Sequence, residues 1–321
     1  MPQKRKAPAL RNVLMVMDPL EKLDLRWDNS LALAYEFYRR GTAVWTADSG
    51  DVRLEGQSVF ARTSQLKIVG VHAFRTASPD QRDLGSFDLV LIRKEPPFDL
   101  NYLYLTFILE KAARKLPVVN HPRGIRNANE KLWGILHTAK TPETILSSSP
   151  EDLLHFFHGL KSAMVVKPLH DKGGRGIFLI PHGAKNAAKR LVKATSGGTQ
   201  TLACQRYIQT LGSMDKRIVL LDGKVLCAFE RHPSKGEFRA NLGLGAAARP
   251  TRLTRAEKNL IEELAPALRR EGLYLAGLDV MGEKLLEVNV TSPAGLTDAE
   301  ALYPGGDFIG AWATWLSRFC A

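Results

Sequence analysis

Two carboxylates and an amide lie close together near the end of the chain, within residues 277–293. Apolar runs on both sides of residues 282–283 predict a β-hairpin there. Glu287 and Asn289 are two residues apart, so they project from one face of the second strand. A three-residue loop would place Asp279 directly opposite Glu287, whereas a two-residue loop would put the two carboxylates on opposite faces.

This pair of carboxylates indicates a metal site. Like charges directly opposite each other destabilise a sheet, and a cation between them removes that repulsion. Two carboxylates and an amide oxygen are hard ligands, which suit Mg²⁺ that is shared with substrate phosphates. We therefore predict Asp279, Glu287 and Asn289 as metal ligands. An ordinary hairpin with a solvated polar face is the alternative that this stretch alone leaves open.

A glycine-rich loop at residues 168–176 connects two predicted strands. A Walker A loop or a Rossmann fingerprint would lead into a helix and have a different glycine spacing, so both are excluded. Backbone N–H groups at Gly173 and Gly174 can still approach phosphates closely. Lys167 ends the preceding strand, and an ammonium group there suits nucleotide phosphates. A flexible surface hairpin is the alternative reading of the loop alone.

Residues 231–245 form a long polar segment that is punctuated by glycines. Loops of this length inside a compact domain are usually functional or disordered. A lid that excludes water from a reacting acyl group is one such function, and Arg239 and Asn241 would then face the reacting phosphate. A mobile surface loop with incidental arginines is the alternative.

The overall composition is that of a water-soluble globular protein with more than one core. The 321 residues are too many for one typical core and predict two or three subdomains. The formal net charge of +12 favours anionic partners, but the basic residues are dispersed and form no nucleic-acid motif. We find no apolar run that approaches the roughly 18 residues of a membrane span, and the basic start lacks the apolar region of a secretory signal. The three cysteines are widely separated, which fits a reducing compartment, and Cys204 and Cys227 are expected in the core.

Predicted strands and helices alternate in the first part of the chain. This alternation indicates a mostly parallel α/β sheet, whose ligands gather at the carboxyl ends of the strands. The expected strands there are residues 13–17, 42–46, 87–92 and 117–120, with a small hairpin at 52–62 and helices from Asn29 or Ser30 to Gly41 and at 102–115. Further along we expect helices at 151–160, 254–271 and 310–319, strands at 163–167, 177–180 and 201–208, and a hairpin at 218–229.

Nine segments, taken in order, resemble bacterial glutathione synthetases, which are ATP-grasp ligases. The segments are VMDP, DNSLALAYEFYRRG, LIRKEPPFD, NHPRGIRNANEKL, VVKPL, KGG, DKRIVLLDG, GEFRANLG and GLDVMGEKLLEVNVTSP. The resemblance implies an N-terminal, mostly parallel α/β substrate domain at residues 1–125, followed by a two-subdomain ATP-grasp fold. Its central subdomain would span residues 126–205, and its C-terminal subdomain, residues 206–321, would carry the lid and the metal site.

The resemblance also implies a reaction and a set of residue roles. The activity would be synthesis of glutathione from γ-glutamylcysteine and glycine through an acyl phosphate, with ATP and Mg²⁺, or Mn²⁺ in its place. We expect small-molecule partners, a homo-oligomer in the cytoplasm, and neither a membrane nor a nucleic acid as partner. The implied nucleotide-binding residues are Lys131, Lys167, Gly173, Gly174, Gln205, Tyr207 and Ile208. The implied metal ligands are Asp279, Glu287 and Asn289, and Arg217, Arg239 and Asn241 would stabilise the acyl phosphate and the tetrahedral species.

The sequence departs from the family pattern at several positions. His170-Asp171-Lys172 stands where an Asp-Gly pair is usual, and Glu95 stands where an aspartate is common. Thr297 occupies a position that usually holds arginine, and Leu244 lies where the lid usually has paired glycines. These departures leave open a related ligase that joins another carboxylate and amine, or a nucleotide-binding homologue without turnover. A nucleic-acid binder remains a further hypothesis, which would show strongly salt-dependent affinity.

Overall fold

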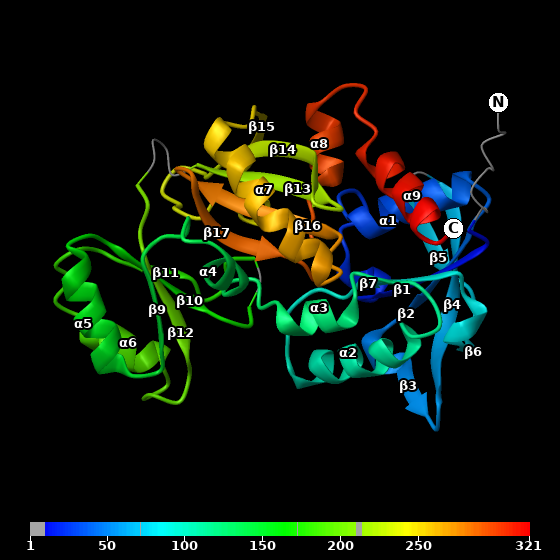
Figure 1. The fold of residues 1–321 in the computed structure, drawn as a ribbon, viewed down its shortest axis with the longest axis horizontal. Helices are drawn as coiled ribbons and strands as arrows, with labels where there is room; N and C mark the ends of the chain where they lie inside the picture. The colour runs from blue at the N-terminus through cyan, green and yellow to red at the C-terminus, as the bar shows by residue number, and fades with distance from the viewer. Residues whose placement is uncertain (1–9, 71, 172, 210–213) are drawn as a thin grey trace.

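The strands of the protein form three sheets in the computed structural model (Figure 1). The structure describes residues 10–70, 72–171, 173–209 and 214–321. The basic start of the chain and Lys172 lie outside these residues. Within the described ranges the sheets have eight, four and five strands, and the five-stranded sheet lies between the other two in Figure 1. In the same ranges, none of the helices combines the length and the hydrophobicity that crossing a bilayer requires.

The N-terminal sheet has a parallel centre and an antiparallel extension. Its strand order is β3-β4-β2-β1-β7-β8, and β5 and β6 also pair with β4. The pairs β1–β2, β1–β7 and β7–β8 are parallel, whereas β4 is antiparallel to its partners. The predicted α/β class is confirmed, but the antiparallel part is larger than the sequence indicated. The strands are β1 (Asn12–Met17), β2 (Ala43–Ala47), β3 (Val52–Glu55), β4 (Ser58–Gly70), β5 (Ala73–Thr76), β6 (Asp80–Asp83), β7 (Leu89–Arg93) and β8 (Val118–Val119).

Strand β1 is apolar from Val13 to Met17 because helices cover both faces of the sheet. Leu14 and Val16 point to one side, where they share a core with helix α2 (Leu100–Ala112). Val13 and Met15 point to the other side and share a core with helix α1 (Asn29–Arg39). The C-terminal helix α9 (Phe308–Phe319) joins this second core, so the end of the chain returns to α1 (Figure 1).

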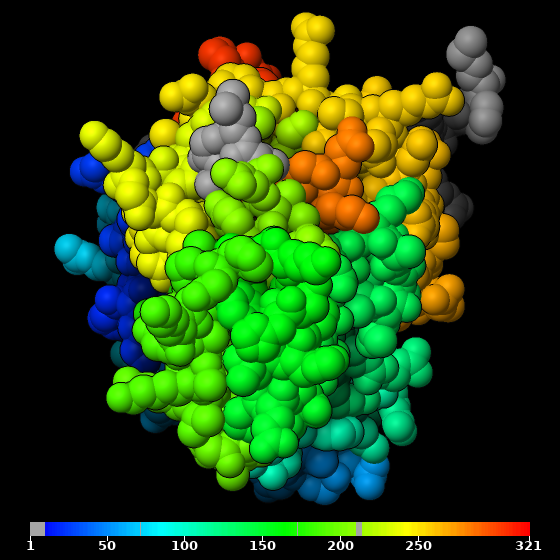
Figure 2. Space-filling model, turned by 90° about the vertical axis from the view of Figure 1, so that its left-hand side faces the viewer, coloured from blue at the N-terminus to red at the C-terminus, as the bar shows by residue number. Residues whose placement is uncertain are grey.

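The four-stranded sheet is antiparallel and carries the glycine-rich loop. Its order is β11-β10-β12-β9, and the loop connects β10 to β11. Helices α5 and α6 share a separate core with it, and this part of the chain forms the near face in Figure 2, coloured green. The elements are β9 (Thr144–Ser147), α5 (Pro150–Leu160), β10 (Met164–Pro168), β11 (Phe178–Ile180), α6 (Ala187–Ala194) and β12 (Leu202–Arg206).

The five-stranded sheet is also antiparallel, in the order β15-β14-β13-β16-β17. Leu260, Leu264 and Leu268 of helix α7 pack on one face of it. Helix α8 packs on part of the other face, and the remainder of that face is available to the site. The elements are β13 (Asp215–Leu221), β14 (Lys224–His232), β15 (Ala247–Pro250), α7 (Arg255–Arg270), β16 (Leu275–Met281), β17 (Lys284–Asn289) and α8 (Leu296–Leu302). Two short helices, α3 (Pro122–Asn127) and α4 (Trp133–His137), connect the N-terminal sheet to the rest of the chain.

Helix α1 begins differently from the expectation. Asp28 is its cap, because its carboxylate accepts hydrogen bonds from the backbone N–H groups of Ser30 and Leu31 at 2.8 and 2.9 Å. Asn29 and Ser30, the expected caps, are buried instead. Their side chains face residues 93 and 293, so they connect the N-terminal sheet to the chain that follows β17.

Candidate functional site

One cavity collects all the residues that the sequence predicted for a site. It is bounded by the four-stranded sheet, the five-stranded sheet and the segment that follows β14. The predicted residues that line it are Lys131, Lys167, Gly173, Gly174, Gln205, Tyr207, Ile208, Arg217, Arg239, Asn241, Asp279, Glu287 and Asn289. The fold therefore places the predicted nucleotide, metal and lid residues around one space.

Asp279 pairs with Glu287 in the β16–β17 hairpin, as predicted, but the hairpin geometry differs from the predicted one. Its loop has two residues, because Met281 pairs with Lys284. By itself such a loop would separate the carboxylates onto opposite faces. A β-bulge follows, in which Leu286 is the extra residue, and it brings Asp279 opposite Glu287. The two residues therefore stand opposite each other in the ladder, as the three-residue loop would also have placed them.

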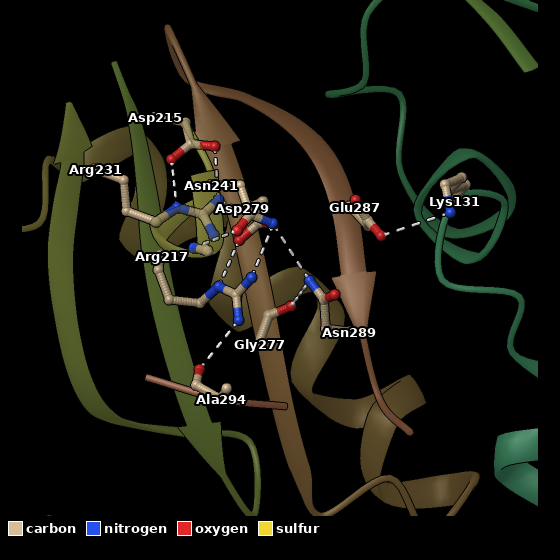
Figure 3. Close-up of polar contacts among 11 residues, drawn as sticks. Lys131, Asp215, Arg217, Arg231, Asn241, Gly277, Asp279, Glu287, Asn289 and Ala294 are labelled. Atoms are coloured by element: carbon tan, nitrogen blue, oxygen red, sulfur yellow. Dashed lines mark hydrogen bonds and ion pairs between the residues drawn. The ribbon is translucent and has the colours of Figure 1, made fainter. Parts of the chain in front are cut away.

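Two buried arginines hold the Asp279 carboxylate (Figure 3). Arg217 donates from Nε and Nη2 to the two carboxylate oxygens at 2.6 and 3.0 Å. Arg231 Nη2 lies 3.0 Å from Asp279 Oδ2. Burial alone would raise the pKa of Asp279, but Arg217 and Arg231 outweigh it and lower that pKa to about 2. Asp279 is therefore ionised at neutral pH.

Arg231 also pairs with a second buried carboxylate, that of Asp215. Nε and Nη2 of Arg231 donate to Asp215 at 2.7 and 2.6 Å. Burial raises the pKa of Asp215 to about 6, and the charge of Asp279 adds to that rise, while Arg231 opposes it. Two carboxylates thus share one guanidinium group, which fixes the position of both.

The oxygen atoms of this face fit a divalent cation. The Asn289 amide nitrogen donates to the Gly277 carbonyl at 3.2 Å and to Asp279 at 3.3 Å, so its amide oxygen points away from Asp279 (Figure 3). Glu287 is two residues before Asn289 on β17, and its side chain remains partly exposed. No group of three or more His, Cys, Asp or Glu side chains with metal-ligand geometry occurs among the described residues. A cation here would therefore need phosphate or water oxygens besides the three protein ligands.

Two buried lysines face the same carboxylates. Lys131 Nζ lies 4.0 Å from Glu287 Oε1 and donates to the Asp171 carbonyl at 2.6 Å. Lys167 ends β10 and is 7% exposed. Burial lowers its pKa, while Glu287 favours the charged form. Both ammonium groups have few solvent partners, so an anion that enters the cavity would be strongly attracted.

The segment after β14 closes against the glycine-rich loop. Arg239 Nη1 donates to the Gly174 carbonyl at 2.9 Å, and its Nη2 donates to Glu237 at 2.6 Å. Gly174 has φ +76°, and a Cβ there would lie 3.2 Å from the Arg239 side chain, so this contact depends on glycine. Asn241 accepts a hydrogen bond from the Gly243 N–H and begins a short 3₁₀ helix, Leu242–Leu244. In Figure 2 this segment, in yellow, borders the green face.

Three of the predicted nucleotide-binding residues, Gln205, Tyr207 and Ile208, lie at the end of β12. Gln205 is buried, and its amide donates to Thr144 at 3.0 Å. Tyr207 follows the strand, and its ring makes an edge contact with Phe238 at 6.4 Å between centroids. This contact connects the four-stranded sheet to the segment after β14, and Ile208 completes this wall of the cavity.

Comparisons with known proteins identify the family. The family model of the prokaryotic glutathione synthetase N-terminal domain matches residues 12–126. The model of the prokaryotic glutathione synthetase ATP-grasp domain matches residues 130–304. The chain belongs to the prokaryotic glutathione synthetase family. It is 33% identical to the glutathione synthetase of Escherichia coli strain K12 over 294 residues, which is 90% of this chain and 93% of that protein. It is 34% identical to the glutathione synthetase of Vibrio cholerae over 297 residues, which is 90% and 92% of the two chains.

The fold is that of ATP-grasp ligases. The crystal structure of D-cycloserine synthetase DcsG superposes with a TM-score of 0.69 at 13% identity, over 96% of this chain and 100% of that one. ATP-grasp ligase PsnB superposes with a TM-score of 0.63 at 16% identity, over 96% and 98%. Membership of the glutathione synthetase family makes this chain an ATP-dependent ligase, and the family uses ATP with a divalent metal ion.

The cavity is also lined by three charged residues that sequence reasoning did not assign. Arg231 is one, because β14 continues to His232 and so carries this residue into the sheet instead of the lid. Asp215 pairs with it and opens β13, and its position beside Lys216 and Arg217 was a signal for a charged cluster. Glu130 also lines the cavity, but its partners lie about 160 residues away in sequence, so no local pattern could have indicated it.

Proposed function

We propose that this chain joins the cysteinyl carboxylate of γ-glutamylcysteine to the amine of glycine, with conversion of ATP to ADP and phosphate. One observation carries the proposal. The bulge in β17 brings Asp279 opposite Glu287 in a cavity that also holds Lys131 and Lys167. This arrangement gathers metal ligands and phosphate-binding cations at one place, which phosphoryl transfer from ATP requires.

We assign the nucleotide to the space between the four-stranded and five-stranded sheets. Gln205, Tyr207 and Ile208 would hold the adenine at the end of β12. Lys131 and Lys167 would bind the phosphates, and the backbone of Gly173 and Gly174 would cover them. The assignment of Lys131 and Lys167 is supported by their burial and by the carboxylates that their ammonium groups face across the cavity.

We assign Asp279, Glu287 and Asn289 to Mg²⁺, or to Mn²⁺ in its place. A bound divalent ion would neutralise and align the phosphate oxygens. The protein prepares for it by holding Asp279 between Arg217 and Arg231, which keeps that carboxylate ionised and in one orientation. Glu287 is the second proposed carboxylate ligand. Its Oε1 atom lies 4.0 Å from Lys131 Nζ, so the lysine orients this carboxylate without neutralising it in a close ion pair.

The reaction would take place in two steps. A carboxylate oxygen of γ-glutamylcysteine attacks the γ-phosphorus of ATP, the bond from that phosphorus to the bridging oxygen breaks, and ADP leaves. The amine nitrogen of glycine then attacks the acyl carbon, phosphate leaves with the bonding electrons, and the amine loses a proton. Arg217, Arg239 and Asn241 would stabilise the charge that develops in both steps. Closure of residues 233–246 would exclude water, which otherwise hydrolyses an acyl phosphate.

A second candidate differs only in the substrates. The Thr297 hydroxyl donates to the Trp27 carbonyl at 2.8 Å and lies 3.1 Å from Asn29 Oδ1. This position usually holds arginine in the family, so a cation that could meet a substrate carboxylate is replaced by a short internal contact. The observation favours a ligase for a related carboxylate or amine as the alternative to glutathione synthesis.

We extend the proposal to the organisation of the chain. We divide it into an N-terminal substrate domain at residues 1–125 and ATP-grasp subdomains at 126–205 and 206–321. We also propose that the chain acts in the cytoplasm as a homo-oligomer. The support for the compartment is that Cys204, Cys227 and Cys320 are all unpaired thiols.

Product analysis tests the proposed function. The purified chain, ATP, Mg²⁺, γ-glutamylcysteine and glycine should give glutathione, ADP and phosphate in equal amounts. Glu287→Gln, which keeps the size of the side chain and removes the charge, should lower turnover by about 10²–10³-fold. Turnover of other carboxylates but not of γ-glutamylcysteine would contradict glutathione synthesis and support the second candidate. Full activity of Glu287→Gln would contradict the metal assignment.

A further inference from the structure

Residues 129–131 connect the two walls of the nucleotide cavity. Asn129 and Lys131 donate side-chain hydrogen bonds to backbone carbonyls of the glycine-rich loop, at 3.0 and 2.6 Å. Glu130, between them, pairs with β17: its backbone carbonyl accepts from the Val288 N–H at 2.9 Å. Three consecutive residues thus contact both the loop of one sheet and the edge strand of the other.

The Glu130 carboxylate holds the chain directly after the last residue of β17. Its Oε1 accepts from the Val290 N–H at 2.9 Å, from the Thr291 N–H at 3.0 Å and from the Thr291 hydroxyl at 2.8 Å. Val290 and Thr291 are buried, at 0% and 4% exposure. Water therefore cannot replace this acceptor, and its loss would leave buried donors unsatisfied.

We infer that Glu130 is a positioning residue for the metal site. By fixing residues 290 and 291, it fixes Asn289 and Glu287 just before them, and its backbone bond keeps Lys131 beside Glu287. The inference rests on the proposed function, because it takes β17 as the metal-binding strand. All three side-chain bonds go to one oxygen atom, so the role requires an acceptor and not a negative charge.

Metal-dependent nucleotide binding tests this role without turnover. We would titrate ADP binding against Mg²⁺ by calorimetry in the full chain and record the Mg²⁺ concentration at half-saturation. Glu130→Ala should raise that concentration about 10–100-fold, as is typical when a residue that orients metal ligands is lost. Glu130→Gln keeps an oxygen acceptor in place and should stay within about threefold of the wild-type value.

A second pair of variants keeps the test valid if Glu130→Ala does not fold. Thr291→Val removes one donor of the three and should raise the Mg²⁺ requirement, whereas Thr291→Ser keeps the hydroxyl and should not. Equal values for these two variants, or an unchanged Glu130→Ala, would overturn the role of Glu130. A Glu130→Gln variant as impaired as Glu130→Ala would also overturn it, because the charge would then be the requirement.

The same titration separates this inference from the proposed function. Wild-type chain that binds ADP with no dependence on Mg²⁺ would contradict the proposed metal site, and with it the role of Glu130. Wild-type chain that needs Mg²⁺, together with unaffected Glu130 and Thr291 variants, would contradict the role of Glu130 alone.

Discussion

Replacing Arg231 by methionine removes the guanidinium group that two buried carboxylates share. Asp215 and Asp279 are 8% and 6% exposed, so neither can exchange Arg231 for bulk water. Asp215 loses both of its bonds to Arg231, at 2.7 and 2.6 Å. Asp279 keeps the two bonds from Arg217. The larger part of the loss therefore falls on Asp215.

The expected cost follows from this geometry. Breaking a buried ion pair by removing one partner costs about 3–5 kcal/mol. The single contact that Asp279 loses adds about 1 kcal/mol. We therefore expect Arg231→Met to lower the free energy of unfolding by about 4–6 kcal/mol, a large part of the roughly 5–15 kcal/mol that is typical of folded proteins.

The cost should depend on pH in a defined direction. The pKa of Asp215 is raised to about 6, above its ordinary value of 3.8. A raised folded-state pKa contributes stability that is present below pH 3.8 and is lost as pH rises through about 6. Without Arg231 the pKa of Asp215 rises further, because the opposing positive charge is gone. The stability difference between wild type and Arg231→Met should therefore be smaller at pH 5 than at pH 8.

Urea unfolding, followed by circular dichroism at both pH values, measures this difference. The control is the double variant Asp215→Leu/Arg231→Met, which removes both charges and should recover most of the loss. A loss below about 1 kcal/mol in Arg231→Met would refute the reasoning. A double variant as unstable as Arg231→Met would refute it as well, because the cost would then not come from an unpaired carboxylate.

Three further predictions concern the core, the thiols and the nucleotide lysine. Gly124→Ala should lower the free energy of unfolding by about 3 kcal/mol in a urea titration, because the new Cβ would lie 2.1 Å from the Glu271 carbonyl oxygen. Its control, Gly159→Ala on helix α5, meets nothing within 4 Å and should be about 0.5–1 kcal/mol more stable than wild type. Cys204 and Cys227 should not react with a thiol reagent at pH 8 until urea is added. The reason is that burial raises the pKa of each thiol to about 12. Rapid labelling of either thiol in the native chain would contradict their packing. Because burial lowers the pKa of Lys167, Mg²⁺–ADP affinity should begin to fall with rising pH below the ordinary lysine value of 10.5. In a calorimetric pH series, the Mg²⁺–ADP affinity of Lys167→Arg should depend less on pH than that of wild type. The same pH dependence of affinity in both chains would exclude Lys167 from the phosphate site.

Local patterns predicted the central parallel strands and the long helices, but not β5, β6, β9, β15, α6 or α8. The apolar run of β1 and the alternation of strands and helices led to the correct α/β class, since these signals depend on burial and periodicity. The thirteen predicted site residues all line one cavity. Gly173, Gly174 and the residues of the lid lie in loops, whereas Arg217, Asp279 and Glu287 lie within strands of the five-stranded sheet.

Long-range pairing could not be predicted from the sequence. The alignment of Asp279 with Glu287 depends on a bulge at Leu286, and no residue type in that strand requires a bulge. Arg231 was assigned to the lid because it opens a long polar segment that is punctuated by glycines. Tertiary pairing with β13 keeps Arg231 within β14 instead. The Asp28 cap was missed because Asn29 and Ser30 are equally good capping residues. The contacts that engage their side chains are distant in sequence: Asn29 meets residues 293 and 297, and Ser30 meets Arg93.

Isotope transfer tests the central claim most directly. γ-Glutamylcysteine with ¹⁸O at both oxygens of its cysteinyl carboxylate would be incubated with the wild-type chain, ATP, Mg²⁺ and glycine, and the phosphate would be analysed by mass spectrometry. An acyl phosphate formed from that carboxylate predicts one ¹⁸O atom in the phosphate for each glutathione produced. Phosphate without ¹⁸O, or phosphate release that does not require γ-glutamylcysteine, would contradict the account.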